Sequence, residues 1–251
     1  MERTLKPFYL IGVIILLYYG CLSTSPKPTR PEMSFRLHII RHAQGTHNIA
    51  HDKTIPDPPL TEEGIQQSED LCRDFPYKEK VGLVITSPLQ RTLQTATVGF
   101  EQSIDQKYYS KSSGRGITGG ARLSLEPDAQ AHSSRPCDTG SDISVLQSRF
   151  PGLSWDTLDM DSTFPAKKGI YATDAESLQL RGWRLQRRLE EYFTQLQNSE
   201  RPDIVVLSHG GWLKYVIGQD VGVKAAKWKT FEVSFDEDSR IVVESSLSED
   251  A

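Results

Sequence analysis

The chain has few of the features that mark specialised protein classes. Cysteine is scarce: Cys21 belongs to an apolar N-terminal segment, which leaves Cys72 and Cys137 as the pair that could form a disulfide in an oxidising compartment. The chain has no internal repeat and no long basic block, and its net charge is −4. A nucleic acid is therefore not expected as a partner, and any anion-binding site must be local.

Asparagine is rarer still. Asn48 and Asn198 are the only two, and neither begins an Asn-x-Ser/Thr sequence, so N-glycosylation gives no information on topology. The composition, with 37% hydrophobic and 25% charged residues, is ordinary for a soluble globular protein. A chain of 251 residues fits one large α/β domain better than two domains.

The N-terminal segment differs from the rest. Residues 8–22 (FYLIGVIILLYYGCL) contain no charge and follow Arg3 and Lys6. As a helix they would span roughly 22 Å, less than the bilayer core of about 30 Å, so they predict a cleaved signal peptide or an uncleaved signal anchor. We expect a leader and linker at 1–33, a folded domain at 34–251, and a protein that is membrane-anchored or secreted, with membrane contact through residues 8–22 if the leader is not cleaved.

Short apolar runs alternate with helical patterns along the rest of the chain. The expected strands are 35–40, 81–86, 122–125 and 203–207, with a closing hairpin at 231–235 and 240–244; the expected helices include 61–75, 88–99 and 174–197. Because the central strands are apolar on both faces, they predict an α/β fold, a three-layer α/β/α sandwich with a mainly parallel central sheet. Residues 101–121 and 127–140 are polar and are expected to cover the pocket, the first as a mobile surface insertion.

Three strand-to-helix junctions end in residues that bind anions. They are Arg41-His42, the sequence SPLQR ending at Arg91, and SHGG starting at Ser208. Parallel strands present such junctions at the same edge of the sheet, where helix N-termini add free N–H groups. Two guanidinium groups and two imidazoles at one edge predict a site for a phosphoryl group.

These motifs resemble those of the histidine phosphatase (phosphoglycerate mutase-like) superfamily. RHAQGTHN at 41–48 resembles its Arg-His-Gly signature with Ala43 in place of the usual Gly, SPLQRT resembles its second arginine motif, and LSHGG resembles its second histidine motif. The order and spacing fit over about residues 35–217. With PLT at 59–61 and PCDTG at 136–140, the sequence looks most like a fungal branch of the superfamily, here with an N-terminal membrane leader.

The resemblance implies a role for each site residue. His42 would be the nucleophile, because a neutral imidazole can attack phosphorus near pH 7, and a backbone carbonyl would hold its other ring nitrogen. Arg41, Arg91 and His209 would neutralise the phosphate and its transition state. Asn48 and Gly210 would complete the phosphate-binding set.

One carboxyl group could protonate the leaving alkoxide and later deprotonate the attacking water. The family places such a residue after the middle strand, which indicates Glu126, with Asp128 as the alternative. Asp138 could line the pocket or belong to a simple turn. On the long helix, Arg181, Arg184, Arg187 and Arg188 are expected to form a solvated face.

The sequence thus predicts a phosphoric monoester hydrolase that acts on a small phosphorylated substrate without metal or cofactor. His47 and His51 do not predict a metal site, because they lie in a Pro-rich loop with no cysteine cluster nearby. Two alternatives stay open: a mutase of the same fold, which returns the phosphoryl group to a substrate, and a catalytically silent phosphate-binding module.

Overall fold

The computed structural model describes residues 34–158 and 161–247. Its strands are β1 Phe35–Arg41, β2 Val81–Thr86, β3 Arg122–Leu125, β4 Asp203–Ser208, β5 Trp228–Phe235 and β6 Ile241–Ser246. Its α-helices are α2 Thr46–Ile49, α3 Glu62–Asp74, α4 Gln90–Gly99, α5 Ile143–Arg149, α6 Ala175–Leu196 and α7 Gly210–Ile217. Short 3₁₀ helices are η1 Lys78–Lys80, η2 Gln106–Tyr108, η3 Pro127–Ala129, η4 Pro136–Asp138, η5 Trp155–Thr157 and η6 Gly169–Tyr171.

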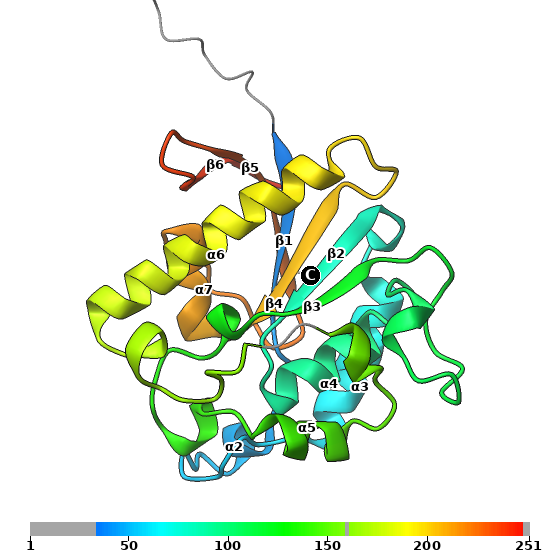
Figure 1. The fold of residues 1–251 in the computed structure, drawn as a ribbon, viewed down its shortest axis with the longest axis vertical. Helices are drawn as coiled ribbons and strands as arrows, with labels where there is room; N and C mark the ends of the chain where they lie inside the picture. The colour runs from blue at the N-terminus through cyan, green and yellow to red at the C-terminus, as the bar shows by residue number, and fades with distance from the viewer. Residues whose placement is uncertain (1–33, 159–160, 248–251) are drawn as a thin grey trace, which may run out of the picture. The chain divides into compact units, whose positions relative to one another are not determined.

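The strands form one six-stranded sheet in the order β3-β2-β4-β1-β5-β6 (Figure 1). The four strands from β3 to β1 pair in parallel, whereas β5 pairs antiparallel with β1 and with β6. The mixed, mostly parallel sheet was predicted, and so was the closing hairpin.

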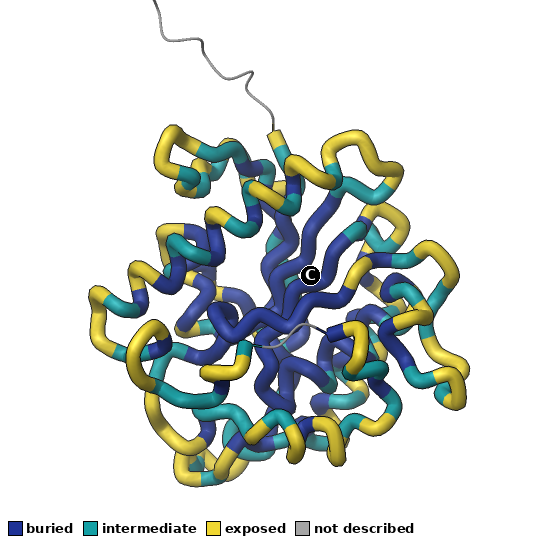
Figure 2. The backbone as a smooth tube through the Cα atoms, in the orientation of Figure 1, coloured by how far each residue is buried: buried dark blue, intermediate teal, exposed yellow. Residues whose placement is uncertain are grey.

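Alternating residues of the central strands divide the core into two layers. Ile40, Val84 and Val205 join the cluster that α3 and α4 contribute to. Ile39 and Val206 join the cluster on the opposite face, which α6 and α7 cover. Burial along these strands is nearly complete (Figure 2), which explains why both faces of each strand are apolar.

The helices begin where the sequence places capping groups. Thr61 accepts a hydrogen bond from the amide of Gly64 at the start of α3, and Asp174 accepts one from Ser177 at the start of α6. Gly218 ends α7 in the left-handed conformation, with φ of 80°. These local signals and the apolar spacing together define the helices.

The segment at 101–121 differs from the predicted surface insertion. Ile104, Tyr108 and Tyr109 are buried in the core beside α4. Backbone pairing of Ile104 with Ala121 closes the segment on itself, and pairing of Tyr109 with Leu153 ties it to the rest of the domain. The apolar residues at its start, rather than its Gly- and Ser-rich centre, decide its packing.

The structure does not test the predicted N-terminal leader, and it leaves the two cysteines of the folded domain unpaired. The leader and linker at 1–33 lie outside the described residues, so the membrane prediction stays a prediction. Within 34–158 and 161–247, no helix has the length and apolarity needed to cross a bilayer. Cys72 and Cys137 are free thiols in this structure.

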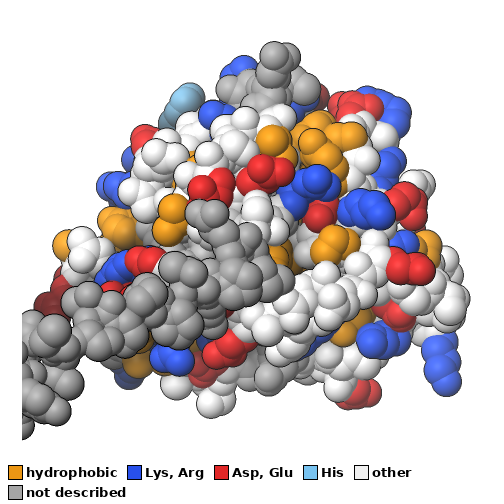
Figure 3. All heavy atoms as spheres, turned by 90° about the horizontal axis from the view of Figure 1, so that it is seen from above, with side chains coloured by type: hydrophobic (Ala, Val, Ile, Leu, Met, Phe, Trp, Pro, Cys, Tyr) orange, Lys and Arg blue, Asp and Glu red, His pale blue; other side chains and the backbone are white. Residues whose placement is uncertain are grey.

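The face at which β1 begins lies opposite the carboxyl edge of the sheet. Acidic and basic side chains are mixed on this face, with small apolar groups between them (Figure 3). Mixed charges of this kind are typical of an ordinary solvated surface. The carboxyl ends of the parallel strands lie at the other edge.

Shortening a buried side chain of the central strand β4 should destabilise the domain. Leu207 is completely buried, so Leu207→Ala should lower the free energy of unfolding by about 2–5 kcal/mol. Leu180, on the exposed side of α6, is 50% exposed, and Leu180→Ala should change it by less than about 0.5 kcal/mol. Urea unfolding checks both variants, and equal losses would contradict the assignment of β4 to the core.

Candidate active site

The pairing register brings the three predicted junctions together. Arg41 pairs with Ser208 across β1 and β4, and Thr86 pairs with Leu207 across β2 and β4. The pairing continues one residue past the strand ends: the amide of His42 donates to the carbonyl of Ser208 (3.0 Å). The carboxyl ends of β1, β2 and β4 therefore meet at one place, as expected for an anion site in an open α/β sheet.

A cavity of about 550 Å³ opens at this edge. It is lined by predicted site residues and by several others, namely Arg41, His42, His47, Asn48, Arg91, Ala131, His132, Asp138, His209, Gly210, Gly211, Lys214, Asp220, Gly222, Val223 and Lys224. Six of the predicted site residues thus share one cavity. The remaining one, Glu126, does not line it.

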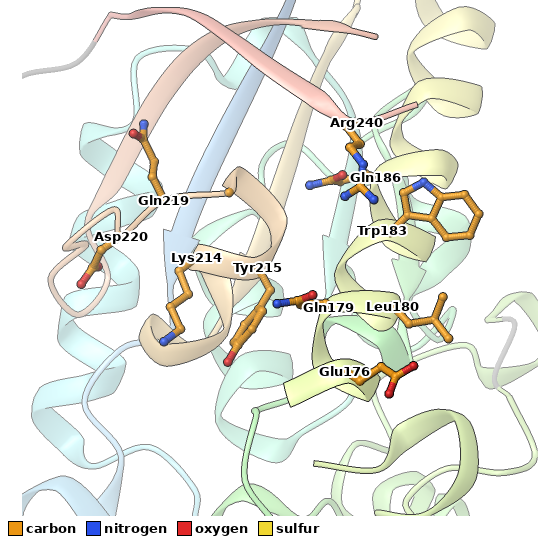
Figure 4. Close-up of a pocket in the computed structure, with 11 residues that line it drawn as sticks. Glu176, Gln179, Leu180, Trp183, Gln186, Lys214, Tyr215, Gln219, Asp220 and Arg240 are labelled. Atoms are coloured by element: carbon orange, nitrogen blue, oxygen red, sulfur yellow. The ribbon is translucent and has the colours of Figure 1, made fainter. Parts of the chain in front are cut away.

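A second hollow, of about 810 Å³, lies between α6, α7 and the end of the β5–β6 hairpin. Trp183 of α6, Tyr215 of α7 and Arg240 line it (Figure 4). It shares Lys214 and Asp220 with the first cavity but contains none of the predicted site residues. The smaller cavity is therefore the candidate active site.

One ring nitrogen of His42 is held by a backbone carbonyl, and the other faces the guanidinium of Arg91. Its Nδ1–H donates to the backbone carbonyl of Ala43 (2.7 Å), as predicted, which assigns the ring's lone pair to Nε2. Arg91 Nε donates to Nε2 at 3.1 Å. Burial, and then the charge of Arg91, hold the pKa of His42 well below its usual range. The ring is therefore neutral near pH 7, and its Nε2 lone pair accepts the hydrogen bond from Arg91.

Ala43 fits the place where the family signature has glycine. It is completely buried and packs against Leu60 and Ala226. The structure gives Ala43 no positive φ, so the methyl group introduces no backbone strain there. The departure from the signature therefore leaves the position of His42 undisturbed.

Arg91 lies at the centre of the site and is 1% exposed. Its guanidinium donates to His42, to His209 Nδ1 (2.9 Å), to the carbonyl of Cys137 (2.6 Å) and to Asp138 (3.1 Å). Asp138 supplies the neutralising carboxylate, so it belongs to the site and not to a simple turn.

His209 is held between Arg91 and Ser87. Its Nδ1 accepts from Arg91, so Nε2 carries the proton and donates to Ser87 Oγ at 2.9 Å. Its ring centroid lies 5.1 Å from that of His42. Burial, and then Arg91, hold the pKa of His209 well below its usual range.

Arg41 has donor capacity that the protein does not use. Its Nε is buried, and no acceptor among the described residues bonds to it. Burial lowers the pKa of this guanidinium. A Cβ added at Gly210 would stand 3.5 Å from Arg41 Nε, so the start of α7 and this cation lie together. Such an arrangement favours an anion between them.

Asn48 lines the cavity, but its side chain bonds locally. Its Oδ1 accepts from the amide of Gly45 (3.0 Å) and its Nδ2 donates to His47 Nε2 (3.2 Å). Burial and the nearby Arg91 lower the pKa of His47 to about 4. Asn48 thus has a defined place at the cavity wall beside His47, a histidine that the sequence had not assigned to the site.

The placement of Glu126 and Asp128 corrects the prediction of the general acid. Glu126 accepts from Tyr192 (3.0 Å) and pairs with Arg188 (2.8 Å). Asp128 pairs with Arg184 and with Arg188 (2.6 Å). Neither carboxylate lines the cavity of His42; both are paired with arginines of α6 instead. This geometry argues against both as proton donors to a substrate held there.

Three of the four arginines of α6 depart from the predicted solvated face, whereas Arg187 is exposed as predicted. Arg181 is completely buried; its guanidinium lies over the ring of Trp212 at 3.8 Å and donates to the carbonyls of Gln130 (3.0 Å) and Ala131 (3.2 Å). Arg184 and Arg188 bind the two carboxylates described above. These contacts connect residues far apart in the sequence, which helical periodicity cannot reveal.

Sequence reasoning also missed His132. It lies in the predicted covering loop, and its ring is so close to α7 that a Cβ on Gly211 would come within 2.5 Å of its Cε1. A lone histidine in a polar loop carries no motif. Among the described residues, no group of three or more His, Cys, Asp or Glu side chains is arranged to hold a metal ion.

Comparisons with known proteins agree with this geometry. Residues 37–106 match the family described as the Histidine phosphatase superfamily (branch 1). A probable phosphatase of Schizosaccharomyces pombe is 26% identical over 177 residues, which cover 69% of this chain and 73% of that protein. A phosphoglycerate mutase-like protein of Arabidopsis thaliana is 27% identical over 201 residues, 70% of this chain and 71% of that one.

The matches support homology to the histidine phosphatase superfamily. They include both a fungal and a plant protein, so the fungal branch stays a prediction. Two solved structures support the same fold. A mycobacterial glucosyl-3-phosphoglycerate phosphatase in complex with VO3 has a TM-score of 0.51 at 19% identity, covering 84% of this chain and 98% of that one. Mycobacterial hydrolase 1 has a TM-score of 0.50 at 18% identity, covering 84% and 97%.

The neutral histidines of the site should make the fold sensitive to acid. The pKa of His42 is lowered in the folded state, so below about pH 6.5 the unfolded chain binds a proton that the folded chain does not. The free energy of unfolding should then fall with decreasing pH by up to about 1.4 kcal/mol per unit for this histidine. Urea unfolding at pH 5 and pH 7 should show a shallower fall in His42→Asn than in the wild type. Parallel curves would contradict a buried, neutral His42.

Proposed function

We propose that this chain is a phosphomonoesterase that hydrolyses a small phosphorylated substrate through a covalent phosphohistidine at His42, without a metal ion. The observation that carries the proposal is the state of His42, which is neutral, held at Nδ1 by Ala43, and directed by Nε2 at Arg91. Similarity to proteins named as phosphatases supports the same reaction class.

The proposed reaction has two displacements at phosphorus. In the first, the His42 Nε2 lone pair forms a bond to phosphorus while the bond to the substrate's leaving oxygen breaks, and that oxygen gains a proton. In the second, a water loses a proton as its oxygen bonds to phosphorus and the N–P bond breaks. Inorganic phosphate leaves, and His42 returns to its neutral form.

Three groups would stabilise the phosphoryl oxygens. Arg41 offers an unused buried donor, Arg91 can redirect its donors from His42 and His209 to the phosphate, and the first turn of α7 contributes free N–H groups beginning at Gly210. Electrostatic stabilisation of this kind is the main requirement of phosphoryl transfer, because the transition state carries its charge on the equatorial oxygens. Asn48 would add a neutral donor.

The size and charge of the cavity favour a small anionic substrate. Its volume of about 550 Å³ lies within the range of small-molecule sites. Lys214 and Lys224 line it beyond the two arginines. We therefore assign the part of the substrate beyond the phosphate to the side of the cavity formed by α7 and residues 220–224.

Replacement of His42 should abolish turnover. With p-nitrophenyl phosphate and EDTA, the full-length wild type should release nitrophenol, and His42→Asn should be slower by at least about 10³-fold because the nucleophile is missing. His51→Asn is the matched control: His51 is exposed and has a φ of 50°, which asparagine adopts readily. It should keep wild-type activity.

Labelling, acceptor and binding measurements on the same two proteins separate the alternatives. Acid-labile, base-stable labelled phosphate on the wild type, absent from His42→Asn, supports the phosphohistidine. Phosphate transfer that needs an added hydroxylated acceptor, with little release in water, would favour a mutase. Phosphate binding with no turnover of any ester would favour the silent module, and equal rates for wild type and His42→Asn would overturn the nucleophile assignment.

A further inference from the structure

The proposed hydrolysis needs a group that gives a proton to the leaving oxygen and takes one from water, and the predicted carboxylates lie elsewhere. We propose that His132 is this group. The inference rests on the proposed function, since it assigns a second catalytic residue to the same cavity. It is carried by the position of His132 on the cavity wall and by the engagement of the other titratable groups there.

The backbone before His132 is held firmly. Arg181 donates to the carbonyls of Gln130 and Ala131 (3.0 and 3.2 Å), and Lys167 Nζ donates to the carbonyl of Ala131 at 2.7 Å. Three hydrogen bonds, two of them charge-assisted ones from Arg181, thus fix the two residues that lead into His132. A loop side chain supported in this way can act with a defined geometry.

The ring of His132 lies against the first turn of α7, next to the phosphate-binding groups. A Cβ on Gly211 would stand 2.5 Å from its Cε1 and 2.8 Å from its Nδ1, so glycine at 211 lets the ring lie in this position. Gly210 and His209 precede it in the chain and line the same cavity. The imidazole is therefore at the mouth of the site that holds His42.

The carboxylate nearest to the centre of the site is already engaged. Asp138 pairs with Arg91 through Oδ1 (3.1 Å) and accepts from Ser133 through Oδ2 (2.6 Å). Both of its oxygens therefore have protein donors, and its loss would leave a buried arginine without its counter-charge. The geometry assigns it to holding Arg91 and not to moving protons.

The other titratable groups are less suitable. His47 has a pKa lowered to about 4, so it carries almost no proton near pH 7. Asp220 is exposed and its Oδ1 accepts from the amide of Gly222 (3.1 Å). His132 is half-buried, and no group in the described ranges forms a hydrogen bond with its ring.

The charges around His132 suit a group that changes protonation during the cycle. Burial lowers its pKa, the charges of Lys214, Lys167 and Arg181 lower it further, and Asp138 acts in the opposite direction. A bound phosphate dianion adds negative charge to the same cavity and raises the pKa of this ring. Binding of substrate would thus favour the imidazolium, and departure of the product would favour the neutral ring.

The proton balance closes over the two displacements. His132 gives its proton to the leaving oxygen as the P–O bond breaks and His42 Nε2 bonds to phosphorus. The neutral His132 then takes a proton from water as the water oxygen bonds to phosphorus and the N–P bond breaks. Both histidines end in their starting states.

The test uses two esters of similar shape in the full-length chain. The leaving group of p-nitrophenyl phosphate is weakly basic and needs little protonation, whereas that of phenyl phosphate is more basic. His132→Asn should show a burst of nitrophenol near the wild-type rate, followed by turnover about 10²–10⁴-fold slower, with phosphohistidine accumulating. With phenyl phosphate the burst should also slow, by at least about tenfold more than with the nitrophenyl ester. His51→Asn is the matched control and should behave as wild type.

The burst itself shows that His132→Asn is folded, because its amplitude counts competent sites. Equal losses on the two esters without accumulated phosphohistidine, or rates within about threefold of wild type on both, would overturn the assignment. The same split in Asp220→Asn, with His132→Asn unaffected, would transfer the role to Asp220. If wild type neither releases nitrophenol nor forms phosphohistidine, the proposed function fails and the inference fails with it; if wild type turns over and His132→Asn matches it, the inference alone fails.

Discussion

The buried guanidinium of Arg91 is the interaction on which the site depends. A cation that is 1% exposed must be surrounded by acceptors, and three segments supply them: the loop after β1, the junction after β4, and η4 within the covering loop. Its contacts with His42 and His209 join two strand ends whose residues are far apart in the sequence. The same charge helps to keep both imidazoles neutral. Together with burial and the carbonyl of Ala43, this side chain sets the position and the protonation state of the proposed nucleophile.

The sequence predicted the sheet and the meeting of the three junctions well. Apolar residues at successive positions of β1, β2 and β4 are buried on both faces, and a sheet covered on both sides requires that pattern. Parallel pairing then brings the ends of those strands to one edge without any knowledge of tertiary contacts. His42, Arg91 and His209 could be placed together for this reason.

The failure at Glu126 shows where such reasoning stops. The position after β3 was correct, since Leu125 pairs with Thr86 at the same edge. The direction in which the chain leaves the strand was not encoded in the local pattern. Glu126, just before η3, and Asp128, within it, contact α6, where Arg184 and Arg188 neutralise them. These pairs span about sixty residues, and a helix rich in arginine looks from its sequence like a solvated face.

The resting contacts of Arg91 also set a condition on substrate binding. Its donors already have protein acceptors, and one of them occupies the His42 lone pair that must attack phosphorus. On the proposed mechanism, binding therefore exchanges acceptors: the phosphate oxygens take donors from the two imidazoles, and Nε2 of His42 becomes free. A neutral ligand would lose more in breaking these charge-assisted bonds than it could restore. A phosphate dianion restores them with full charge and also satisfies the unused Nε of Arg41. Selectivity for phosphomonoesters would then follow from the buried cations themselves, before any contact with the rest of the substrate.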